Sequence, residues 1–131
     1  LYLNSNTTYY LNPANTSNFN SIDAQAITVI GAVTAASFTA TSDINLKTNI
    51  QPISNSMSKL KEITGVEFDW KETGEASAGV IAQDVEKVLP QAVQENDEGV
   101  KSVNYNAIIG LLIETVKDQQ KQIDKLEKSI N

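Results

Sequence analysis

The sequence contains no cysteine and no histidine. Disulfides, thiol nucleophiles and Cys/His zinc sites are therefore excluded, and so is every mechanism that needs an imidazole base. We expect neither a metal nor a cofactor. A nucleophilic site would need a serine or threonine activated by a lysine or an α-amine, and an acid–base site would need paired carboxylates.

Arginine is absent too, because all ten basic residues are lysines. Sixteen acidic residues bring the net charge to -6, which does not attract a nucleic-acid backbone, so no nucleic-acid partner is expected. The longest uncharged stretch after Asp23, residues 24–42, is diluted by Thr, Ser, Gly and Gln. Neither a signal peptide nor a membrane span is predicted, and no membrane partner is expected.

A chain of 131 residues has room for one modest core plus an extended arm. Residues 1–41 carry one charge, Asp23, and are rich in Asn, Thr, Ser and Ala. This composition predicts short strands and turns, and a disordered linker is the alternative. Shared burial between chains would account for the apolar side chains of this segment, namely Tyr9, Tyr10, Phe19, Ile22, Ile27, Val29, Ile30 and Val33.

The charge density rises at Ser42, where a compact mixed α/β domain is predicted to begin. Ser54 or Asn55 is expected to cap a short helix that Gly65 stops. Apolar residues then alternate with charged ones, which predicts a half-buried strand with three inward side chains, Val66, Phe68 and Trp70.

A second apolar stretch leads into a short helix over residues 83–89, and Pro90 is expected to end it. Residues 96–99 read NDEG between two apolar segments. This pattern predicts a hairpin turn, with Gly99 at the position that needs a positive φ.

Residues 104–131 show the clearest periodicity, with apolar residues at the a and d positions of a heptad repeat. The narrow stripe favours burial by other copies of the helix over packing on one domain. Periodicity alone leaves dimer and trimer open, and Gln119 in the seam is expected to fix register at a cost in stability. The predicted seam consists of Tyr105, Ile109, Leu112, Val116, Gln119, Ile123, Leu126 and Ile130.

Ser42 and Lys47 form the one nucleophile–base candidate, with a hydroxyl and an amine five residues apart. They would meet if the chain between them turns, and an amine acts as a base only where burial removes its proton. A solvated Ser and Lys near a linker are also commonplace. Solvated surfaces explain the acidic groupings, namely Glu67 with Asp69, Asp84 with Glu86, Asp97 with Glu98, and Asp118, Asp124 and Glu127 on the last helix.

Three segments carry a family resemblance: residues 42–50 read SDINLKTNI, residues 79–93 read GVIAQDVEKVLPQAV, and residues 103–117 read VNYNAIIGLLIETVK. Together they resemble the C-terminal intramolecular chaperone domain of phage endosialidases, tail fibres and neck appendages, the peptidase S74 family. The resemblance covers Ser42 to about Lys128. Residues 1–41 lie where that family carries the end of the mature fibre, as residues of a stalk.

The resemblance implies a homotrimer that holds fibre strands in register while they wind into a triple β-helix or similar stalk. It implies an autoproteolytic serine endopeptidase of single turnover, with Ser42 as nucleophile, Lys47 as proton acceptor and the cut between Ser42 and Asp43. The implied partners are further copies of the chain and the upstream fibre segment. The implied location is a phage virion before cleavage, with the chaperone part released in the host cytoplasm.

The sequence thus predicts an α+β protein with an extended fibrous β arm over residues 1–41 and a chaperone domain over residues 42–131. Its long C-terminal helix, residues 104–131, is expected to form a homotrimeric coiled coil. Two alternatives stay open: a trimerisation foot that never cleaves, and a receptor-binding tip that contacts a host glycan. A cellular membrane-tethered transcription factor of the same family is a further setting, although the Asn/Thr-rich segment favours a virion protein.

Overall fold

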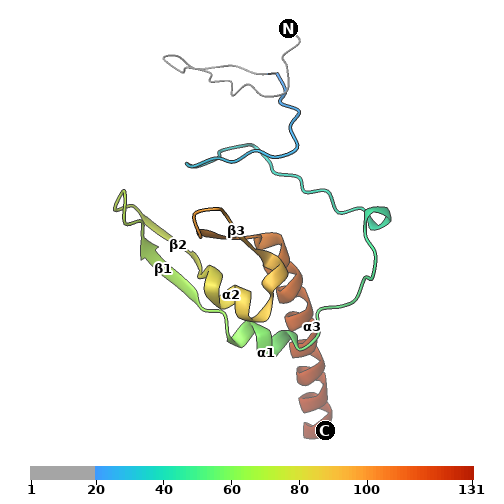
Figure 1. Ribbon diagram of the computed structural model, residues 1–131. Coiled ribbons are helices and arrows are strands. Elements are labelled where there is room, and N and C mark those ends of the chain that lie inside the picture. The colour runs from blue at the N-terminus through green and yellow to red at the C-terminus, as the bar shows by residue number, and fades with distance from the viewer. Residues whose placement is uncertain (1–19) are drawn as a thin grey trace. The chain divides into compact units, whose positions relative to one another are not determined.

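The computed structural model describes residues 20–131 and divides the chain into two compact units, Leu1–Ser42 and Asp43–Asn131 (Figure 1). In the first unit, residues 20–41 form neither helix nor strand, and their side chains are exposed, including Ile30 and Phe38. The residues before 20, with their predicted turns, lie outside the described part of the chain. The fibrous β arm stays a prediction.

The second unit is mixed α/β with a long C-terminal helix, as predicted. The homotrimeric coiled coil stays a prediction, because the structure contains a single chain. The elements of the second unit, in order, are η1 (Ile44–Leu46), α1 (Ser56–Lys61), β1 (Gly65–Asp69), β2 (Ala76–Val80), α2 (Ala82–Val88), η2 (Pro90–Ala92), β3 (Val93–Glu95), β4 (Lys101–Val103) and α3 (Tyr105–Ile130).

The strands form two separate antiparallel hairpins. β1 pairs with β2, with Phe68 opposite Ser77, and β3 pairs with β4, with Val93 opposite Val103. The predicted turn between β3 and β4 is confirmed. Gly99 has a φ of +79°, a left-handed conformation that glycine adopts without strain.

Two predictions about the start of this unit are wrong. Gly65 does not stop the first helix, because α1 already ends at Lys61 and Gly65 begins β1. Trp70 is not a third inward residue, because it lies beyond β1 in the turn to β2, where its N–H donates to the Glu75 carbonyl at 2.9 Å. Its ring is exposed and packs edge-on against Phe68, with 5.1 Å between ring centroids.

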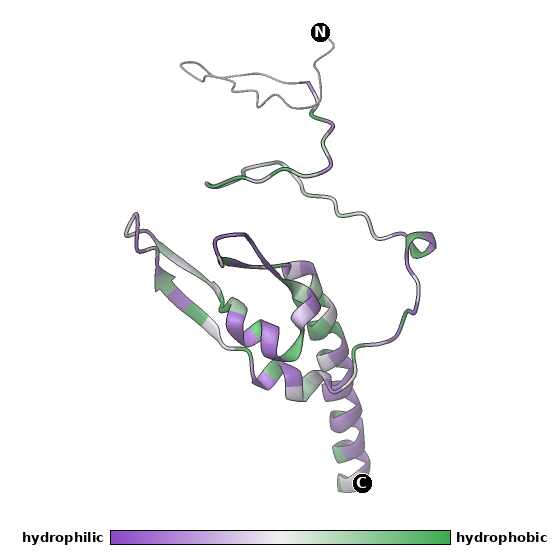
Figure 2. Ribbon diagram, in the orientation of Figure 1, coloured by the Kyte–Doolittle hydropathy of each residue, from purple (hydrophilic) through white to green (hydrophobic). Residues whose placement is uncertain are grey.

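The core lies where α2 and η2 meet the first half of α3. Its buried apolar residues are Val85, Leu89, Ala92, Ile108 and Leu111. Figure 2 shows hydrophobic and hydrophilic residues alternating along α2 and α3, and a mostly hydrophilic C-terminal half of α3. Only the N-terminal half of α3 therefore contributes to the core of this chain.

Candidate functional site

The chain turns immediately after the predicted cleavage position. Asp43 caps η1, because its Oδ1 accepts a hydrogen bond from the Asn45 N–H at 2.8 Å. The Leu46 N–H donates to the Asp43 carbonyl at 3.2 Å, and the Lys47 N–H donates to the Ile44 carbonyl at 3.1 Å. The turn that the Ser/Lys hypothesis needs between Asp43 and Lys47 is therefore present.

The side chains of Ser42, Asp43 and Lys47 are all exposed in the single chain. Ser42 is the last residue of the first unit and Lys47 belongs to the second, so the geometry of the pair stays a prediction. A lysine amine acts as a base near neutral pH where burial or a neighbouring positive charge disfavours its charged form, so a base role for Lys47 stays a prediction.

α3 has two distinct faces. Ile108, Leu111 and Thr115 are buried against the domain, and the Thr115 hydroxyl donates to the Leu111 carbonyl at 2.9 Å. The predicted seam lies on the other face, where Gln119 is also exposed. The exposed fractions of its apolar residues lie between 42% and 83%, for Tyr105, Ile109, Leu112, Val116, Ile123, Leu126 and Ile130. The domain therefore leaves this apolar stripe uncovered.

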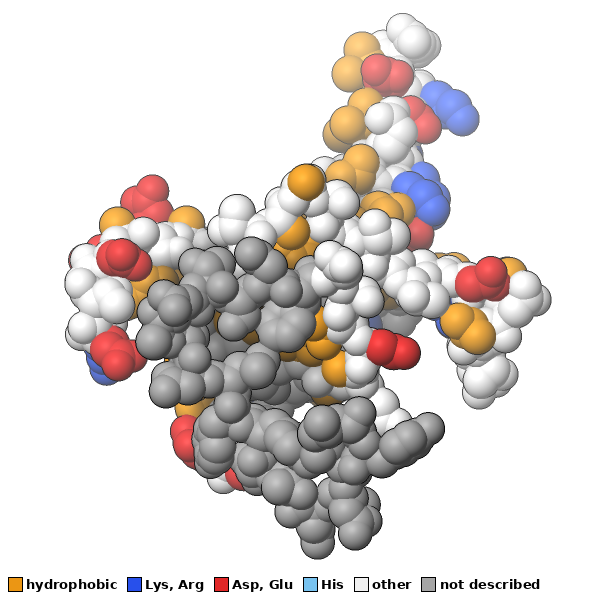
Figure 3. Space-filling model, turned by 90° about the horizontal axis from the view of Figure 1, so that it is seen from above, with side chains coloured by type: hydrophobic (Ala, Val, Ile, Leu, Met, Phe, Trp, Pro, Cys, Tyr) orange, Lys and Arg blue, Asp and Glu red, His pale blue; other side chains and the backbone are white. Residues whose placement is uncertain are grey.

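The C-terminal half of α3 projects beyond α1 and α2 (Figure 1). Every residue from Gln119 onward is exposed, although the helix continues to Ile130. In the view from above, the far projecting part shows orange side chains along one edge and blue and red ones elsewhere (Figure 3). An isolated helix as short as this projecting half, about 12 residues, is marginal in water, so packing by another helix would stabilise it.

Tyr105 occupies a seam position and also contacts its own chain. Its hydroxyl accepts a hydrogen bond from the Val80 N–H at 3.4 Å. The same oxygen lies 2.6 Å from the place that a Cβ on Gly79 would occupy. Tyr105 thus fastens β2 to the start of α3 while 52% of its surface stays exposed.

The first residues of α1 are attached to α3 by contacts that the sequence analysis missed. The Ser56 hydroxyl is buried and donates to Asp118 Oδ2 at 2.8 Å. Gln122 Nε2 donates to Met57 Sδ at 3.4 Å. The interpretation of Asp118 as a merely solvated residue is therefore wrong, because it accepts a hydrogen bond from the buried Ser56 of α1. No local signal in the sequence links two residues so far apart.

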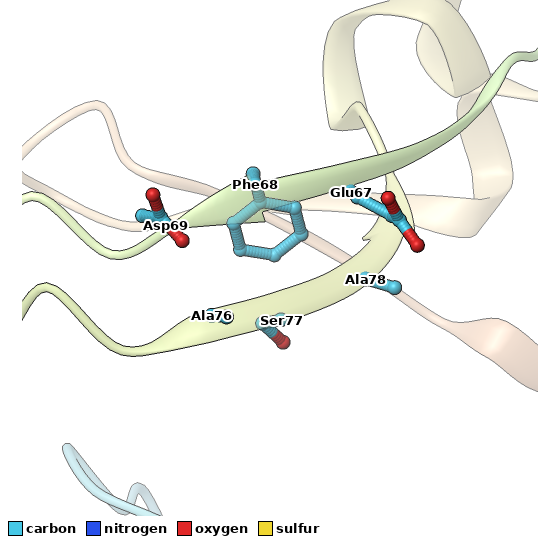
Figure 4. Close-up of a pocket in the computed structure, with 6 residues that line it drawn as sticks. All are labelled: Glu67, Phe68, Asp69, Ala76, Ser77 and Ala78. Atoms are coloured by element: carbon cyan, nitrogen blue, oxygen red, sulfur yellow. The ribbon is translucent and has the colours of Figure 1, made fainter.

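A hollow also lies on the β1–β2 hairpin. Six residues line it: Glu67, Phe68, Asp69, Ala76, Ser77 and Ala78 (Figure 4). Glu67 and Asp69 lie on the exposed, polar face of β1, as predicted. Within residues 20–131, no group of three or more acidic side chains is placed to hold a metal ion. None of the helices in that range is both long enough and apolar enough to span a bilayer.

Comparison with known proteins agrees with the first two motif segments, residues 42–50 and 79–93. Residues 42–94 match the family described as chaperone of endosialidase, Peptidase S74. The chain is 38% identical over 98 residues to the long tail fiber protein Gp37 of Enterobacteria phage K3, which is 68% of this chain and 8% of that protein. The corresponding protein of Enterobacteria phage T2 gives 38% over 98 residues, 68% of this chain and 7% of the relative.

Gp37 of Salmonella phage S16 is 34% identical over 111 residues, which is 76% of this chain and 15% of that protein. The chain thus spans a small part of the length of the curated tail-fibre relatives. The family match begins at Ser42, where the composition changes, one residue before the second unit starts. Residues 42–94, with the turn at Asp43 and the α2 core helix, belong to the chaperone of endosialidase family, Peptidase S74.

Proposed function

We propose that residues 42–131 are an intramolecular chaperone that trimerises the end of a phage tail fibre and then releases itself by autoproteolysis between Ser42 and Asp43. The family match and the tail-fibre relatives support a role in fibre assembly. The observation that carries the proposal furthest is the uncovered apolar stripe of α3. A helix that offers one face to its own core and a heptad seam to the outside fits a trimerisation element.

Trimerisation before fibre folding has a clear physical advantage. Strands from three chains that wind around one another make non-local contacts, which form slowly. A coiled coil forms from local contacts and raises the effective concentration of the three attached ends. Residues 20–41, with their exposed apolar side chains, are the described part of the segment that would then fold.

Cleavage would make assembly irreversible. The peptide bond between Ser42 and Asp43 breaks, water supplies a hydroxyl to the Ser42 carbonyl carbon, and a proton goes to the Asp43 nitrogen. Lys47 would accept the proton of the attacking group and return it. Once the chaperone has left, the fibre loses its nucleation element, and its persistence depends on a slow unfolding rate.

The Ser42 hydroxyl does not attack its own carbonyl easily, because the ring formed would have four members. Attack from a neighbouring chain, activation of a water molecule or an acyl shift avoids this strain. The exposure of Ser42 and Lys47 in the single chain favours a route that depends on the trimer. A trimer would supply the burial that activates Lys47, and cleavage would then act as a check on assembly.

The test is the intact mass of the purified chain beside Ser42→Ala and Lys47→Ala variants, with light scattering to report assembly. We expect the parent to divide after Ser42, and both variants to stay whole and trimeric. A parent chain that stays monomeric would contradict the proposed trimerising chaperone. An uncleaved parent trimer would remove the catalytic roles of Ser42 and Lys47 and leave a trimerisation foot that stays attached, which is the second candidate.

A further inference from the structure

A hollow borders the heptad seam of α3. It lies between α1 and α3 and is lined by Met57, Leu60, Lys61, Thr115 and Gln119, here called the flank hollow. Gln119 belongs to the predicted seam as well, so the hollow opens directly onto the surface that other copies would cover. Met57 and Leu60 are half-buried, and they give the hollow an apolar wall.

The heptad assigns the flank hollow to one side of the seam. With Gln119 at d, Thr115 and Gln122 take g positions and Asp118 takes c. α1 contacts Asp118 through Ser56 and Gln122 through Met57, so it packs on the g flank of α3. In a parallel coiled coil the g flank of one helix faces the e flank of the next. The flank hollow must therefore face residues at e positions of a second copy.

The e flank carries an apolar residue that the seam prediction left out. Ile113 occupies an e position and is 51% exposed in the single chain. The next e position is Gln120, which lies at the height of the flank hollow. An apolar residue outside the a and d positions is expected where a helix is covered over a wider stripe. α1 of a second copy would supply that cover.

We infer that α1 is part of the trimer interface, and that the flank hollow of each copy receives the e flank of its neighbour at Ile113 and Gln120. This inference rests on the proposed trimer. Each contact would join three elements, namely α1 and α3 of one copy and α3 of the next. The compact domain would then contribute to association together with the coiled coil, so an isolated α3 would trimerise more weakly than the full chain.

Thiol crosslinking tests the inference cleanly, because the chain has no cysteine. Lys61→Cys combined with Gln120→Cys places one thiol on the hollow and one on the e flank. We expect a short bifunctional thiol reagent to link these variants between chains into covalent dimers and trimers. Lys61→Cys with Lys121→Cys is the matched control, because Lys121 lies at an outward f position and should give no inter-chain product.

Gln119→Cys alone separates this inference from the proposed function. Thiols at a d position face one another in a parallel coiled coil and should link between chains. If Gln119→Cys links and Lys61→Cys/Gln120→Cys does not, the coiled coil stands and the role of α1 is overturned. If neither links and the chain is monomeric, the proposed trimer fails and the inference fails with it.

A dissociation measurement gives a second readout. Ile113→Ser should raise the concentration at which the trimer dissociates at least about tenfold, because burial of an isoleucine side chain is lost. Lys117→Ser, at an exposed b position, should leave it unchanged. If both variants dissociate at the same concentration, the proposed burial of the e flank is overturned.

Discussion

The buried hydroxyl of Ser56 donates a hydrogen bond to the carboxylate of Asp118 at 2.8 Å, which ties α1 to the middle of α3. The Ser56 bond, and then the bond from Lys121, hold the pKa of the Asp118 carboxyl below its ordinary value. Ser56→Ala should lower the melting temperature at pH 7 by about 5 °C, because a charge-assisted hydrogen bond is lost. Ser129→Ala, an exposed helix position, is the matched control.

The same pair predicts the direction of a pH dependence. A carboxyl whose pKa is lowered by folding stabilises the fold above its unfolded pKa, and this contribution disappears as the pH falls through the folded pKa. The difference in melting temperature between the parent and Ser56→Ala should therefore be full at neutral pH and should shrink below about pH 4. A difference that grows in acid would contradict the role of the Asp118 charge.

Gly79 is expected to be intolerant of a side chain while Tyr105 keeps its hydroxyl. A Cβ at Gly79 would lie 2.6 Å from that oxygen but 3.8 Å from the ring carbon that bears it. Gly79→Ala should cost about 1–3 kcal/mol of unfolding free energy, the usual range for overpacking. In a Tyr105→Phe background the same substitution should cost much less. Urea unfolding of the four proteins measures this coupling, and additive effects would argue against the contact.

The Asp43 side chain is expected to position the cleavage site, if the proposed autoproteolysis occurs. Asp43→Ala removes the bond that caps η1 and should slow cleavage about five- to tenfold, the effect of losing about 1 kcal/mol of cap energy. Asp43→Asn should restore most of the rate, because its amide oxygen accepts the same bond.

The rate is measured from intact mass over time, with Asp69→Ala as an exposed-carboxylate control. Cleavage of Asp43→Ala at the parent rate would show that the cap is irrelevant. A slow Asp43→Asn variant would point to the charge of the carboxylate instead of its hydrogen bond.

Ile123→Asp tests the seam in the half of α3 that projects beyond the domain. The side chain is exposed in the single chain, so the substitution should leave the fold of the monomer intact. Buried carboxylates in a coiled coil are costly, so the trimer should dissociate to monomers at micromolar concentration. Lys125→Asp makes a matched change outside the seam and should stay trimeric in light scattering. An unchanged near-UV circular dichroism spectrum, to which Trp70 contributes, would show that the domain itself is folded.

Several features could be predicted from the sequence because they depend on neighbouring residues. The hairpin turn ending at Gly99 was predicted from its composition, and the structure confirms it with the positive φ. The helix before Pro90 was predicted within one residue at each end. The long helix begins at Tyr105, next to the expected start at residue 104, because its heptad pattern and the Asn104 cap are both local.

Two predictions were wrong because they concern the ends of β1, which depend on how far β1 pairs with β2. Trp70 continues the alternation of Val66 and Phe68 in the sequence, but the β1–β2 pairing stops at Asp69, and Trp70 starts the turn instead. Gly65 looked like a helix stop, yet its role is to begin a strand. A period-2 pattern says which residues share a face and does not say how far a partner strand reaches.

The sequence by itself determined the local elements, the change of character at Ser42, the Ser42–Lys47 spacing and the seven-residue repeat of α3. Only the tertiary structure decided which face of α3 the domain covers, that Tyr105 is held against Gly79, and that Ser56 reaches Asp118. The reason is physical. Helix periodicity and turn chemistry act between residues a few positions apart, whereas packing joins residues whose separation along the chain carries no local signal.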